Sequence, residues 1–367
     1  MRISGVHVYR LDLPLAGSGY AFAKGKHVTS VDTTVVRVAT DAGLNGWGET
    51  CPLGRTYLPS YPEGIRTGIG VLAPALIGED PTRIGAINHT MDQALEGHAY
   101  VKSALDVACH DILGKASGLP VHALLGGRQH DALPMYFSLT QEDPDDMRAA
   151  AERAWSEGYA HVQLKVGGEP EHDIERIRSV VAIKDAGQLV ICDANRGWRR
   201  DEAIRVAEAT RDLDYVFEQP CDRYRDCLSV RRRAAQPFKL DESLKSAEDL
   251  VRAHSDDAFD IACIKISKMG GLTRARFARD FCAAMGIPMC VEDVWGGDLV
   301  TAALAHLAAS TPRDALLNTT DLHNYNTLHF TTGAPVAEGG KLYVSDAPGL
   351  GVTPDEGVLG EPVAVYA

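Results

Sequence analysis

Five ionisable residues recur along the middle of the chain at a nearly constant interval. They are Lys165, Asp193, Glu218, Asp241 and Lys265, and successive members lie 23 to 28 residues apart. Each of them stands at or near the end of a short apolar stretch that is typical of a buried strand. Because this interval accommodates one strand and one helix, the five side chains are expected at one level of a sheet built from β-α repeats.

Charged side chains are tolerated inside a protein only when they are paired with one another or bound to a metal ion. Three carboxylates without a histidine or cysteine partner form a set of hard oxygen ligands, which suits Mg²⁺ and suits Mn²⁺ nearly as well. The alternative is a network of salt bridges inside the sheet, as any single Lys–Asp pair would form. The convergence of all five residues favours the metal site, with Asp193, Glu218 and Asp241 as its ligands.

The two lysines flank this predicted metal site and could act as acid and base. A bound metal stabilises the negative charge that forms on a substrate carboxylate when a lysine removes the neighbouring α-proton, which gives an enediolate. A lysine with an ordinary pKa of about 10.4 must have that pKa lowered by about 3 units to act as a base near neutral pH. The metal and burial both act in this direction. The sequence therefore predicts Lys165 and Lys265 as catalytic residues on opposite faces of the reacting carbon.

Alternation along the strands predicts which neighbours face the site. Gln163 and Asn195 fall on the inward faces of their strands. Lys239 is also expected to point inward, as a structural partner of the carboxylates rather than a catalyst. Lys268 follows the sixth strand and is expected in a solvated loop.

The elements that must carry these residues are short apolar strands separated by stretches with helical spacing. Eight such strands in fewer than 200 residues indicate a closed (β/α)7β barrel of the TIM type, where catalytic side chains project from the carboxyl ends of the strands. A doubly wound open sheet is the alternative, since periodicity alone does not show closure. The predicted strands are Leu133–Leu139, His161–Val166, Leu189–Asn195, Tyr215–Gln219, Phe238–Glu242, Ile261–Ser267, Pro288–Glu292 and Leu316–Thr320.

The residues outside the barrel predict a second unit of the α+β class. Alternation at Thr34–Ala39 and a turn at Asp41–Gly43 indicate an antiparallel sheet, and helical spacing runs through Val101–Lys115. The Gly- and Pro-rich sequence after Asp321 contains a short alternating piece, Lys341–Val344, and is expected to pack back on this unit. The predicted boundaries are 1–128 for the first unit, 129–322 for the barrel and 323–367 for the returning C-terminal segment.

Composition and charge exclude several classes of protein. An excess of 50 Asp and Glu over 37 Lys and Arg gives a net charge of −13, the wrong sign for binding nucleic-acid phosphates. No apolar run reaches the roughly 20 residues that cross a bilayer, and the first ten residues lack the apolar core of a signal peptide, so the cytoplasm is the expected location. The eight cysteines include no Cys-x-x-Cys pair and are expected to be reduced core thiols.

A set of short motifs is spread over most of the chain. They are Trp47-Gly-Glu49, Ala104-Leu-Asp106, Asp111-Ile-Leu-Gly-Lys115, Leu124-Leu-Gly-Gly127, Lys165-Val-Gly167, Asp193-Ala-Asn195, Glu218-Gln-Pro220, Asp241-Glu242 and Lys265-Ile-Ser-Lys-Met-Gly-Gly271. With these motifs the chain resembles the muconate lactonizing enzyme subgroup of the enolase superfamily over nearly its whole length.

The resemblance implies an α+β capping domain, formed by the N-terminal segment and the C-terminal tail, over a (β/α)7β barrel. It also implies Mg²⁺ on the three carboxylates and a Lys165–Lys265 acid/base pair, unlike the His-Asp dyad of the mandelate racemase branch. One departure is Gln163, where the family usually has the first lysine of a Lys-x-Lys motif. Lys165 keeps the catalytic position, but without that like charge, burial and Mg²⁺ must lower its pKa further.

Substrate contacts are expected from the capping loop 17–30, from the segment around residue 57 and from the ends of the seventh and eighth strands. Aromatic rings there would shield the site, while acidic residues and Trp295 would hold a substrate ammonium by charge and cation–π contact. The ordinary alternative is loop packing for Tyr20 and Phe22 and a solvated turn for Asp321. The predicted substrate-contacting residues are Tyr20, Phe22, Tyr57, Asn195, Asp293, Trp295 and Asp321.

The stretch Trp47–Lys115 and the piece Lys165-Val-Gly-Gly-Glu-Pro170 resemble family members that act on hydroxyproline and proline betaine. The first hypothesis is therefore racemisation or 2-epimerisation of a proline-type or betaine-type amino acid. The alternative is dehydration of a hydroxy amino acid such as cis-3-hydroxyproline, which begins with the same proton abstraction.

Other functions fit less well. Asp321-Leu-His323 breaks the Asp-x-Asp pattern of dipeptide epimerases, which disfavours a dipeptide substrate. Cycloisomerisation, o-succinylbenzoate synthesis and a non-catalytic barrel are weaker alternatives. We expect a homo-oligomer that acts on a small carboxylate, an amino-acid derivative, with no nucleic-acid or membrane partner.

Overall fold

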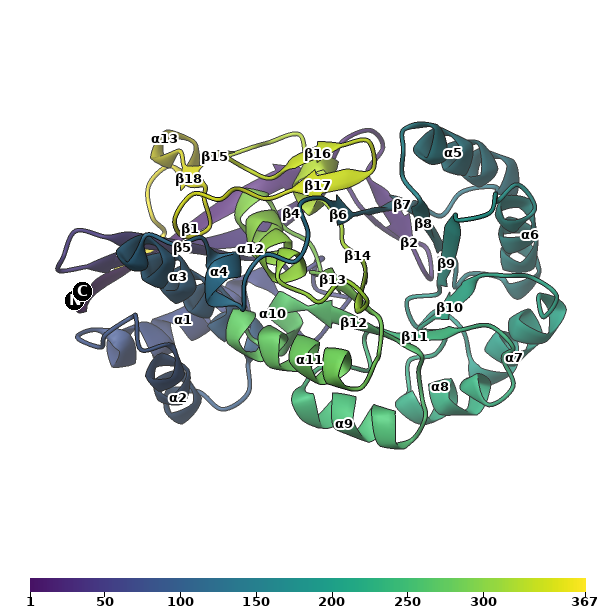
Figure 1. The fold of residues 1–367 in the computed structure, drawn as a ribbon, viewed down its shortest axis with the longest axis horizontal. Coiled ribbons are helices and arrows are strands. Elements are labelled where there is room, and N and C mark those ends of the chain that lie inside the picture. The colour runs from purple at the N-terminus through teal and green to yellow at the C-terminus, as the bar shows by residue number, and fades with distance from the viewer.

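A computed structural model describes residues 1–367, and its larger part is a barrel of eight parallel strands (Figure 1). The strands follow one another in chain order around the sheet, with helices between them. They are β7 (Tyr136–Leu139), β8 (His161–Lys165), β9 (Leu189–Asp193), β10 (Val216–Glu218), β11 (Phe238–Leu240), β12 (Ile261–Lys265), β13 (Met289–Glu292) and β14 (Leu316–Asn318).

Backbone contacts beside the first and last strands close this sheet. Met135 bridges Thr319 in parallel fashion, the Tyr136 N–H donates to the Thr319 carbonyl at 3.0 Å, and the Thr319 N–H donates to the Pro134 carbonyl at 2.8 Å. The predicted (β/α)7β barrel is therefore confirmed, and the open-sheet alternative is excluded.

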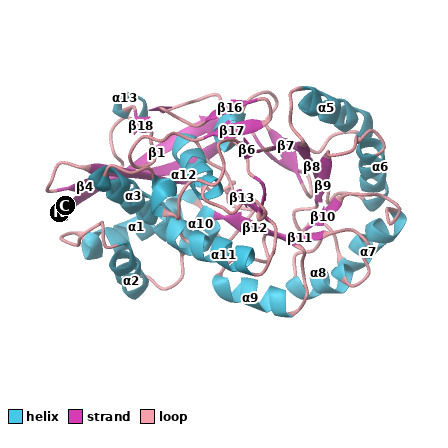
Figure 2. Cartoon of the chain, in the orientation of Figure 1, coloured by secondary structure: helices cyan, strands magenta, loops and turns pink.

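Helices cover the outside of the barrel, as Figure 2 shows. They are α5 (Pro144–Ser156), α6 (Pro170–Val181), α7 (Arg200–Ala209), α8 (Tyr224–Arg231), α9 (Ala247–Ser255), α10 (Ile266–Met269), α11 (Leu272–Ala284) and α12 (Asp298–Ala309). Local sequence explains several starts: Pro144 and Pro170 open their helices, and the Ser246 hydroxyl accepts from the Asp249 N–H to cap α9. Every residue of α12 is buried, as its apolar sequence requires.

The second unit is an antiparallel sheet with three helices against it. The strand order is β19-β1-β4-β5, so the chain's last strand pairs with its first and the two termini lie together in Figure 1. The elements are β1 (Ile3–Pro14), β4 (Ser30–Thr40), β5 (Asn45–Thr50), β19 (Ala364–Tyr366), α1 (Pro62–Leu76), α2 (Ile84–Ala94) and α3 (Ala99–Ser117).

Close packing of α3 on β5 requires glycine in the strand. A Cβ atom at Gly46 would lie 2.1 Å from the Ala108 carbonyl oxygen, and one at Gly48 would lie 2.0 Å from that of Ala104. Both glycines therefore let the helix backbone approach the sheet.

Short elements join the two units. The hairpin of β2 (Tyr20–Phe22) and β3 (Lys26–Val28) extends from the capping sheet to the barrel. The predicted alternating piece near residue 341 forms β17 (Lys341–Tyr343), which pairs with β16 (Val336–Glu338) and with β6 (Leu133–Pro134) beside the barrel. The remaining elements are α4 (Val121–Leu124), η1 (Leu322–Tyr325), β15 (Thr331–Thr332), β18 (Thr353–Pro354) and α13 (Glu356–Leu359).

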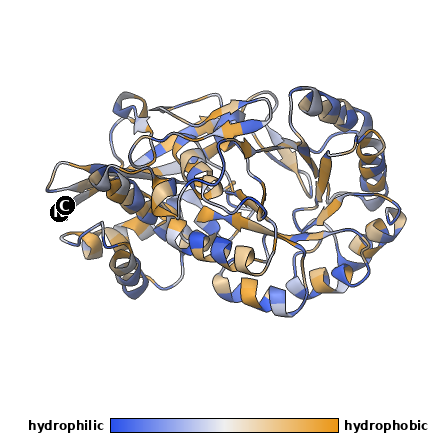
Figure 3. Cartoon of the chain, viewed as in Figure 1, coloured by the Kyte–Doolittle hydropathy of each residue, from blue (hydrophilic) through white to orange (hydrophobic).

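The core follows the hydropathy of the sequence. Figure 3 shows mostly hydrophobic strands inside the barrel and hydrophilic residues along the outer sides of α9 and α11. All eight cysteines are buried and free, which confirms the prediction of reduced core thiols. None of the helices has the length and the apolar character that crossing a membrane would require.

Candidate active site

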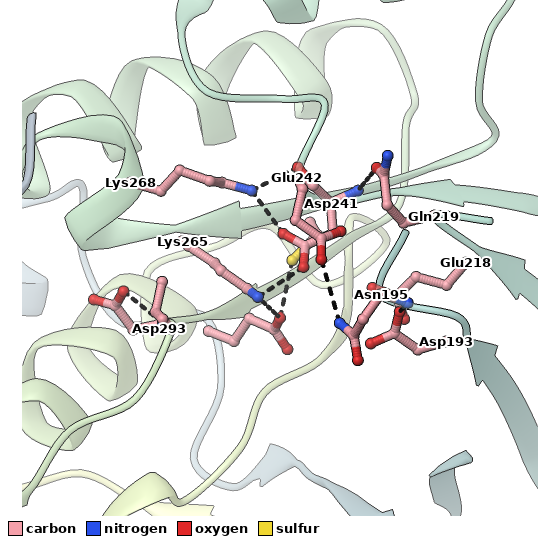
Figure 4. Close-up of polar contacts among 12 residues, drawn as sticks. Asp193, Asn195, Glu218, Gln219, Asp241, Glu242, Lys265, Lys268 and Asp293 are labelled. Carbon is pink, nitrogen blue, oxygen red and sulfur yellow. Dashed lines mark hydrogen bonds and ion pairs between the residues drawn. The ribbon is translucent and has the colours of Figure 1, made fainter. Parts of the chain in front are cut away.

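The five predicted residues meet at the carboxyl end of the barrel. Lys165, Asp193, Glu218 and Lys265 are the last residues of β8, β9, β10 and β12, and Asp241 directly follows β11. In the sheet register, Lys165 is the neighbour of Asp193, which is the neighbour of Glu218. Figure 4 shows four of the five together with the polar residues around them.

Each lysine is buried against a carboxylate. The Lys165 Nζ lies 2.5 Å from the Asp193 Oδ2. The Lys265 Nζ lies 2.7 Å from the Asp241 Oδ2, and it donates to the Tyr57 hydroxyl at 3.3 Å. Since β8 and β12 are four strands apart in an eight-stranded barrel, the two lysines stand on opposite sides of it.

The electrostatics of the lysines differ from the expectation. Burial is the largest single effect on the pKa of Lys165 and acts to lower it, but Asp193, Tyr20 and Glu218 together outweigh it and the net shift is upward. Burial also acts to lower the pKa of Lys265, and Asp241 with the other acidic groups around it together outweigh that effect. Burial therefore acts on both pKa values in the expected direction, but the net shifts are upward because the carboxylates around each ammonium are closer than the sequence could reveal.

The three predicted metal ligands do not lie equally close together. One oxygen of Glu218, one of Asp241 and the Cys263 sulfur all lie within 4.8 Å of one another. Asp193 is outside this group: its Oδ2 pairs with Lys165, and its Oδ1 accepts from the Asn195 N–H at 2.8 Å. Burial raises the pKa of the Cys263 thiol well above its usual range, so this group remains a protonated neighbour.

The donor set nevertheless fits a hard divalent cation. Glu218 is fully buried, and burial followed by the charge of Asp193 raises its pKa to about 8. Its Oε1 lies 3.0 Å from the Lys239 Nζ but receives no hydrogen bond of acceptable direction. A buried carboxylate oxygen without a hydrogen-bond donor, next to other carboxylates, is the arrangement that a Mg²⁺ ion would complete.

Lys268 contradicts its predicted place in a solvated loop. Its side chain is buried, and its Nζ donates to the Oδ1 and to the backbone carbonyl of Asp241, both at 2.7 Å. The reason is local: β12 ends at Lys265 and α10 begins at once, so one helical turn directs Lys268 back toward the end of β11. With Lys265, it holds the pKa of Asp241 well below its usual range, against the upward effect of burial.

Two buried acids at the site were missed. Glu242 accepts from the Asn195 Nδ2 at 3.3 Å, and burial, then the charge of Asp241, raise its pKa to about 7. Glu292 ends β13, lies 3.3 Å from the Lys265 Nζ and accepts from the Tyr136 hydroxyl. The same sequence signal marks Glu292, because it is a charge at the end of the apolar strand Pro288–Glu292.

Above these residues lies a small cavity of about 40 Å³. Three capping-domain aromatics and Trp295 of the barrel cover it: the Tyr20 and Trp295 ring centroids are 5.1 Å apart, and those of Phe22 and Tyr57 are 5.8 Å apart. The site residues in its lining are Tyr20, Phe22, Tyr57, Gln163, Lys165, Asn195, Lys265, Glu292, Asp293 and Trp295. Asp321 instead lines a neighbouring cavity, and its carboxylate accepts from the Asn324 Nδ2 at 2.9 Å.

The two residues expected to hold an ammonium are fixed by the protein. The Asp293 carboxylate accepts from the Ser267 N–H at 3.0 Å, from the Ser267 hydroxyl and from the Val294 N–H, and burial raises its pKa to about 6. The Trp295 indole N–H donates to the Asn326 Oδ1 at 3.0 Å. These hydrogen bonds hold the carboxylate and the ring at the cavity wall.

Comparison with known proteins agrees with this geometry. Residues 21–126 match the family model of the mandelate racemase / muconate lactonizing enzyme N-terminal domain, and residues 146–358 match that of the enolase C-terminal domain-like fold. The chain is 49% identical to a cis-3-hydroxy-L-proline dehydratase of Roseibium aggregatum over 367 residues, all of both chains. It is 28% identical to an N-succinyl-L-Arg/Lys racemase of Bacillus cereus, with 98% of each chain covered.

Solved structures give the same result. A member of the enolase superfamily from Roseovarius nubinhibens ISM, solved in complex with magnesium, superposes with a TM-score of 0.94 at 40% identity, over 100% of this chain and 99% of that one. The family models together match most of the chain. The chain therefore belongs to the mandelate racemase / muconate lactonizing enzyme family and is an enzyme of the enolase superfamily.

Proposed function

We propose that the enzyme dehydrates a 3-hydroxylated proline-type amino acid, with cis-3-hydroxy-L-proline as the leading candidate. The observation that carries this proposal is the 49% identity, over the full length of both chains, to a dehydratase of that substrate. It favours the alternative hypothesis of the sequence analysis over racemisation or epimerisation.

The positions of the lysines suit the stereochemistry of the cis isomer. In cis-3-hydroxyproline the hydroxyl lies on the same ring face as the carboxylate, so the α-hydrogen and the hydroxyl lie on opposite faces. Lys165 and Lys265 approach the cavity from opposite sides of the barrel. One neutral lysine would take the α-proton while the opposed ammonium gives a proton to the departing hydroxyl.

The balance of this step is simple. The Cα–H electron pair becomes the Cα–Cβ double bond, the Cβ–O bond breaks, and the hydroxide leaves as water with the proton of the second lysine. A divalent cation at Asp193, Glu218 and Asp241 would supply positive charge that stabilises the negative charge developing on the substrate carboxylate. Asp293 and the face of Trp295 would hold the ring ammonium.

Epimerisation is the second candidate, because the same opposed lysines could deliver protons to either face of the α-carbon. The relative that racemises N-succinylated amino acids, at 28% identity, shows that this family supports such chemistry. The two reactions share proton removal and differ only in the next step: loss of the β-hydroxyl or return of a proton.

The test is incubation with cis-3-hydroxy-L-proline, its trans isomer and proline betaine in D₂O with Mg²⁺, followed by mass spectrometry and chiral chromatography. Dehydration predicts a product that has lost one water, formed much faster from the cis isomer than from the trans isomer. An epimerase would instead accumulate an inverted isomer with one deuteron and no loss of water. That result would refute the proposed elimination.

Lysine variants assign the two roles. With cis-3-hydroxy-L-proline, the variant that lacks the base should lose both α-hydrogen exchange and elimination, whereas the variant that lacks the acid should keep exchange. Lys165→Ala and Lys265→Ala are the two variants, and Lys341→Ala, at an exposed lysine, is the control. If both site variants keep normal elimination, the two-lysine assignment is wrong.

A further inference from the structure

A chain of hydrogen bonds connects the capping hairpin to a predicted metal ligand. The Tyr20 hydroxyl lies 2.8 Å from the Ser138 Oγ, which lies 3.4 Å from the Gln163 Oε1. The Gln163 Nε2 then donates to the Glu218 Oε2 at 2.9 Å. Tyr20, Gln163 and Glu218 are 8%, 3% and 0% exposed, and Ser138 between them is partly buried.

The chemistry of Glu218 sets the direction of this chain. In the ionised form that a metal ligand takes, the Glu218 carboxylate can only accept, which fits the Gln163 amide nitrogen facing Glu218 and its carbonyl oxygen facing Ser138. The Ser138 hydroxyl then donates to Gln163 and accepts from Tyr20. A lysine at position 163, the usual family residue, would donate to Glu218 but offer Ser138 no acceptor, and would interrupt the chain.

Tyr20, the outer end of this hydrogen-bond chain, lies on the β2–β3 hairpin, which covers the cavity. Next to Tyr20, the Ala21 N–H donates to the Thr140 hydroxyl at 2.7 Å, and the Gln141 N–H donates to the Ala21 carbonyl at 3.0 Å. The Lys165 Nζ lies 6.0 Å from the centre of the Tyr20 ring. In the position seen here, with these contacts formed over the cavity, Tyr20 completes the hydrogen-bond chain.

We propose that Gln163 and Ser138 are positioning residues that couple closure of the capping hairpin to the orientation of the Glu218 carboxylate. A cation bound at Glu218 and a closed hairpin then favour each other, and by linkage the effect is equal in both directions. This inference rests on the proposed metal site and not on the identity of the substrate.

The experiment measures Mg²⁺ binding without substrate. Ser138→Ala breaks the chain in the middle, Tyr20→Phe removes only its outer hydroxyl, and Ser103→Ala removes a buried hydroxyl in α3 that has no partner. Calorimetry gives the Mg²⁺ affinity, and hydrogen–deuterium exchange reports the hairpin peptide 20–28 with and without Mg²⁺. If Ser138→Ala fails to fold, Tyr20→Phe carries the test.

In the unmodified enzyme, Mg²⁺ should slow exchange in the hairpin. Ser138→Ala and Tyr20→Phe should each abolish that slowing and weaken Mg²⁺ binding about two- to tenfold, as expected for one hydrogen bond. The double variant should bind no more weakly than Ser138→Ala, because both changes break the same chain. Ser103→Ala should match the unmodified enzyme.

Equal hairpin protection by Mg²⁺ in Ser138→Ala and in the unmodified enzyme would overturn the coupling, as would additive losses in the double variant. Glu218→Gln serves as the reference. If it leaves Mg²⁺ affinity unchanged, the metal site and the coupling built on it both fail. Dehydratase assays with cis-3-hydroxy-L-proline are scored separately, so a different substrate would leave this result intact.

Discussion

Glu218 and Asp241 have different electrostatic partners, although both are buried carboxylates at strand ends. Asp241 contacts the ammonium groups of Lys265 and Lys268. Glu218 has only Lys239 as a close cation, and its other oxygen accepts a hydrogen bond from Gln163. Removal of one partner from a buried ion pair commonly costs about 3–5 kcal/mol. Asp241→Asn would leave two buried ammonium groups without this partner and Glu218→Gln only one, so Glu218→Gln risks the fold less and is the sharper probe of the metal.

Glu218→Gln should weaken Mg²⁺ binding at least about tenfold, roughly 1.4 kcal/mol, because it removes one anionic ligand. Unfolding free energy without Mg²⁺ should fall by up to about 3–5 kcal/mol, because the buried Lys239 ammonium, 3.0 Å from Oε1, loses its anionic partner. Calorimetry and urea unfolding measure the two quantities, with Asp212→Asn at an exposed carboxylate as the control. Unaltered Mg²⁺ affinity would remove Glu218 from the predicted ligand set.

The sequence could predict the strand-end residues because each is a charge in an otherwise apolar stretch. It could not predict which lysine pairs with which carboxylate. Lys268 was assigned to solvent because its contact with Asp241 depends on a single helical turn after β12, which periodicity does not reveal. The raised pKa of Lys165 likewise depends on a 2.5 Å contact with Asp193 that exists only once β8 and β9 are in register.

At the scale of elements, strand positions were well predicted and strand ends were not. The predicted sixth strand extends through Ser267, but β12 stops at Lys265 and the next residues form α10. That early helix lets the Ser267 N–H and hydroxyl reach the Asp293 carboxylate at the cavity wall. The strand end and these tertiary hydrogen bonds occur together, and the periodicity of the local sequence predicts neither.

The buried helix α12 also contains a titratable residue, His306, that connects it to two other segments. The His306 Nδ1 accepts from the His122 N–H at 3.2 Å, and its Nε2 lies 3.0 Å from the Leu350 carbonyl oxygen and donates to it. His306 thus joins α12 to α4 and to the C-terminal segment as a neutral ring. Burial lowers its pKa to about 3, so protonation would force a charge into this interior.

The lowered pKa of His306 predicts a pH dependence of stability. The unfolded chain has a histidine pKa of about 6.5 and binds the proton first as pH falls, so stability is lost from pH 6.5 toward 3. Between pH 6.5 and 4.5 the unmodified protein should lose about 2 kcal/mol more than His306→Gln. Urea unfolding at both pH values measures this difference, and His172→Gln, at an exposed residue, should behave like the unmodified protein. Equal losses of unfolding free energy in all three proteins between pH 6.5 and 4.5 would show that His306 does not control the loss of stability in acid.

At the scale of the whole molecule, the barrel and the α+β unit were predictable because their hydrophobic periods differ. How the two units join was not predictable, since it depends on single contacts between distant residues. Glu49 lies on β5 of the capping sheet, yet its Oε1 accepts from the Gly297 N–H at 2.7 Å and its Oε2 from the Val300 N–H at 3.1 Å. Glu49 on the capping sheet thus binds the first turn of the barrel helix α12. The positive end of that helix dipole stabilises the Glu49 carboxylate.

Glu49→Gln should weaken this joint and, through it, the substrate cavity. The third partner of Glu49 is the Thr33 hydroxyl, which donates to Oε1 at 2.8 Å, so all three partners are donors. An amide NH₂ in place of one carboxylate oxygen leaves a buried donor unsatisfied, which should lower the free energy of unfolding by about 1–3 kcal/mol. Because Trp295 lies two residues before Gly297, a looser joint should raise KM for the proposed cyclic substrate more than it lowers kcat. Urea unfolding and steady-state kinetics measure both effects, and Glu361→Gln, at an exposed residue, is the matched control. A variant with lower stability but an unaltered KM would show that Glu49 joins the two units without shaping the site.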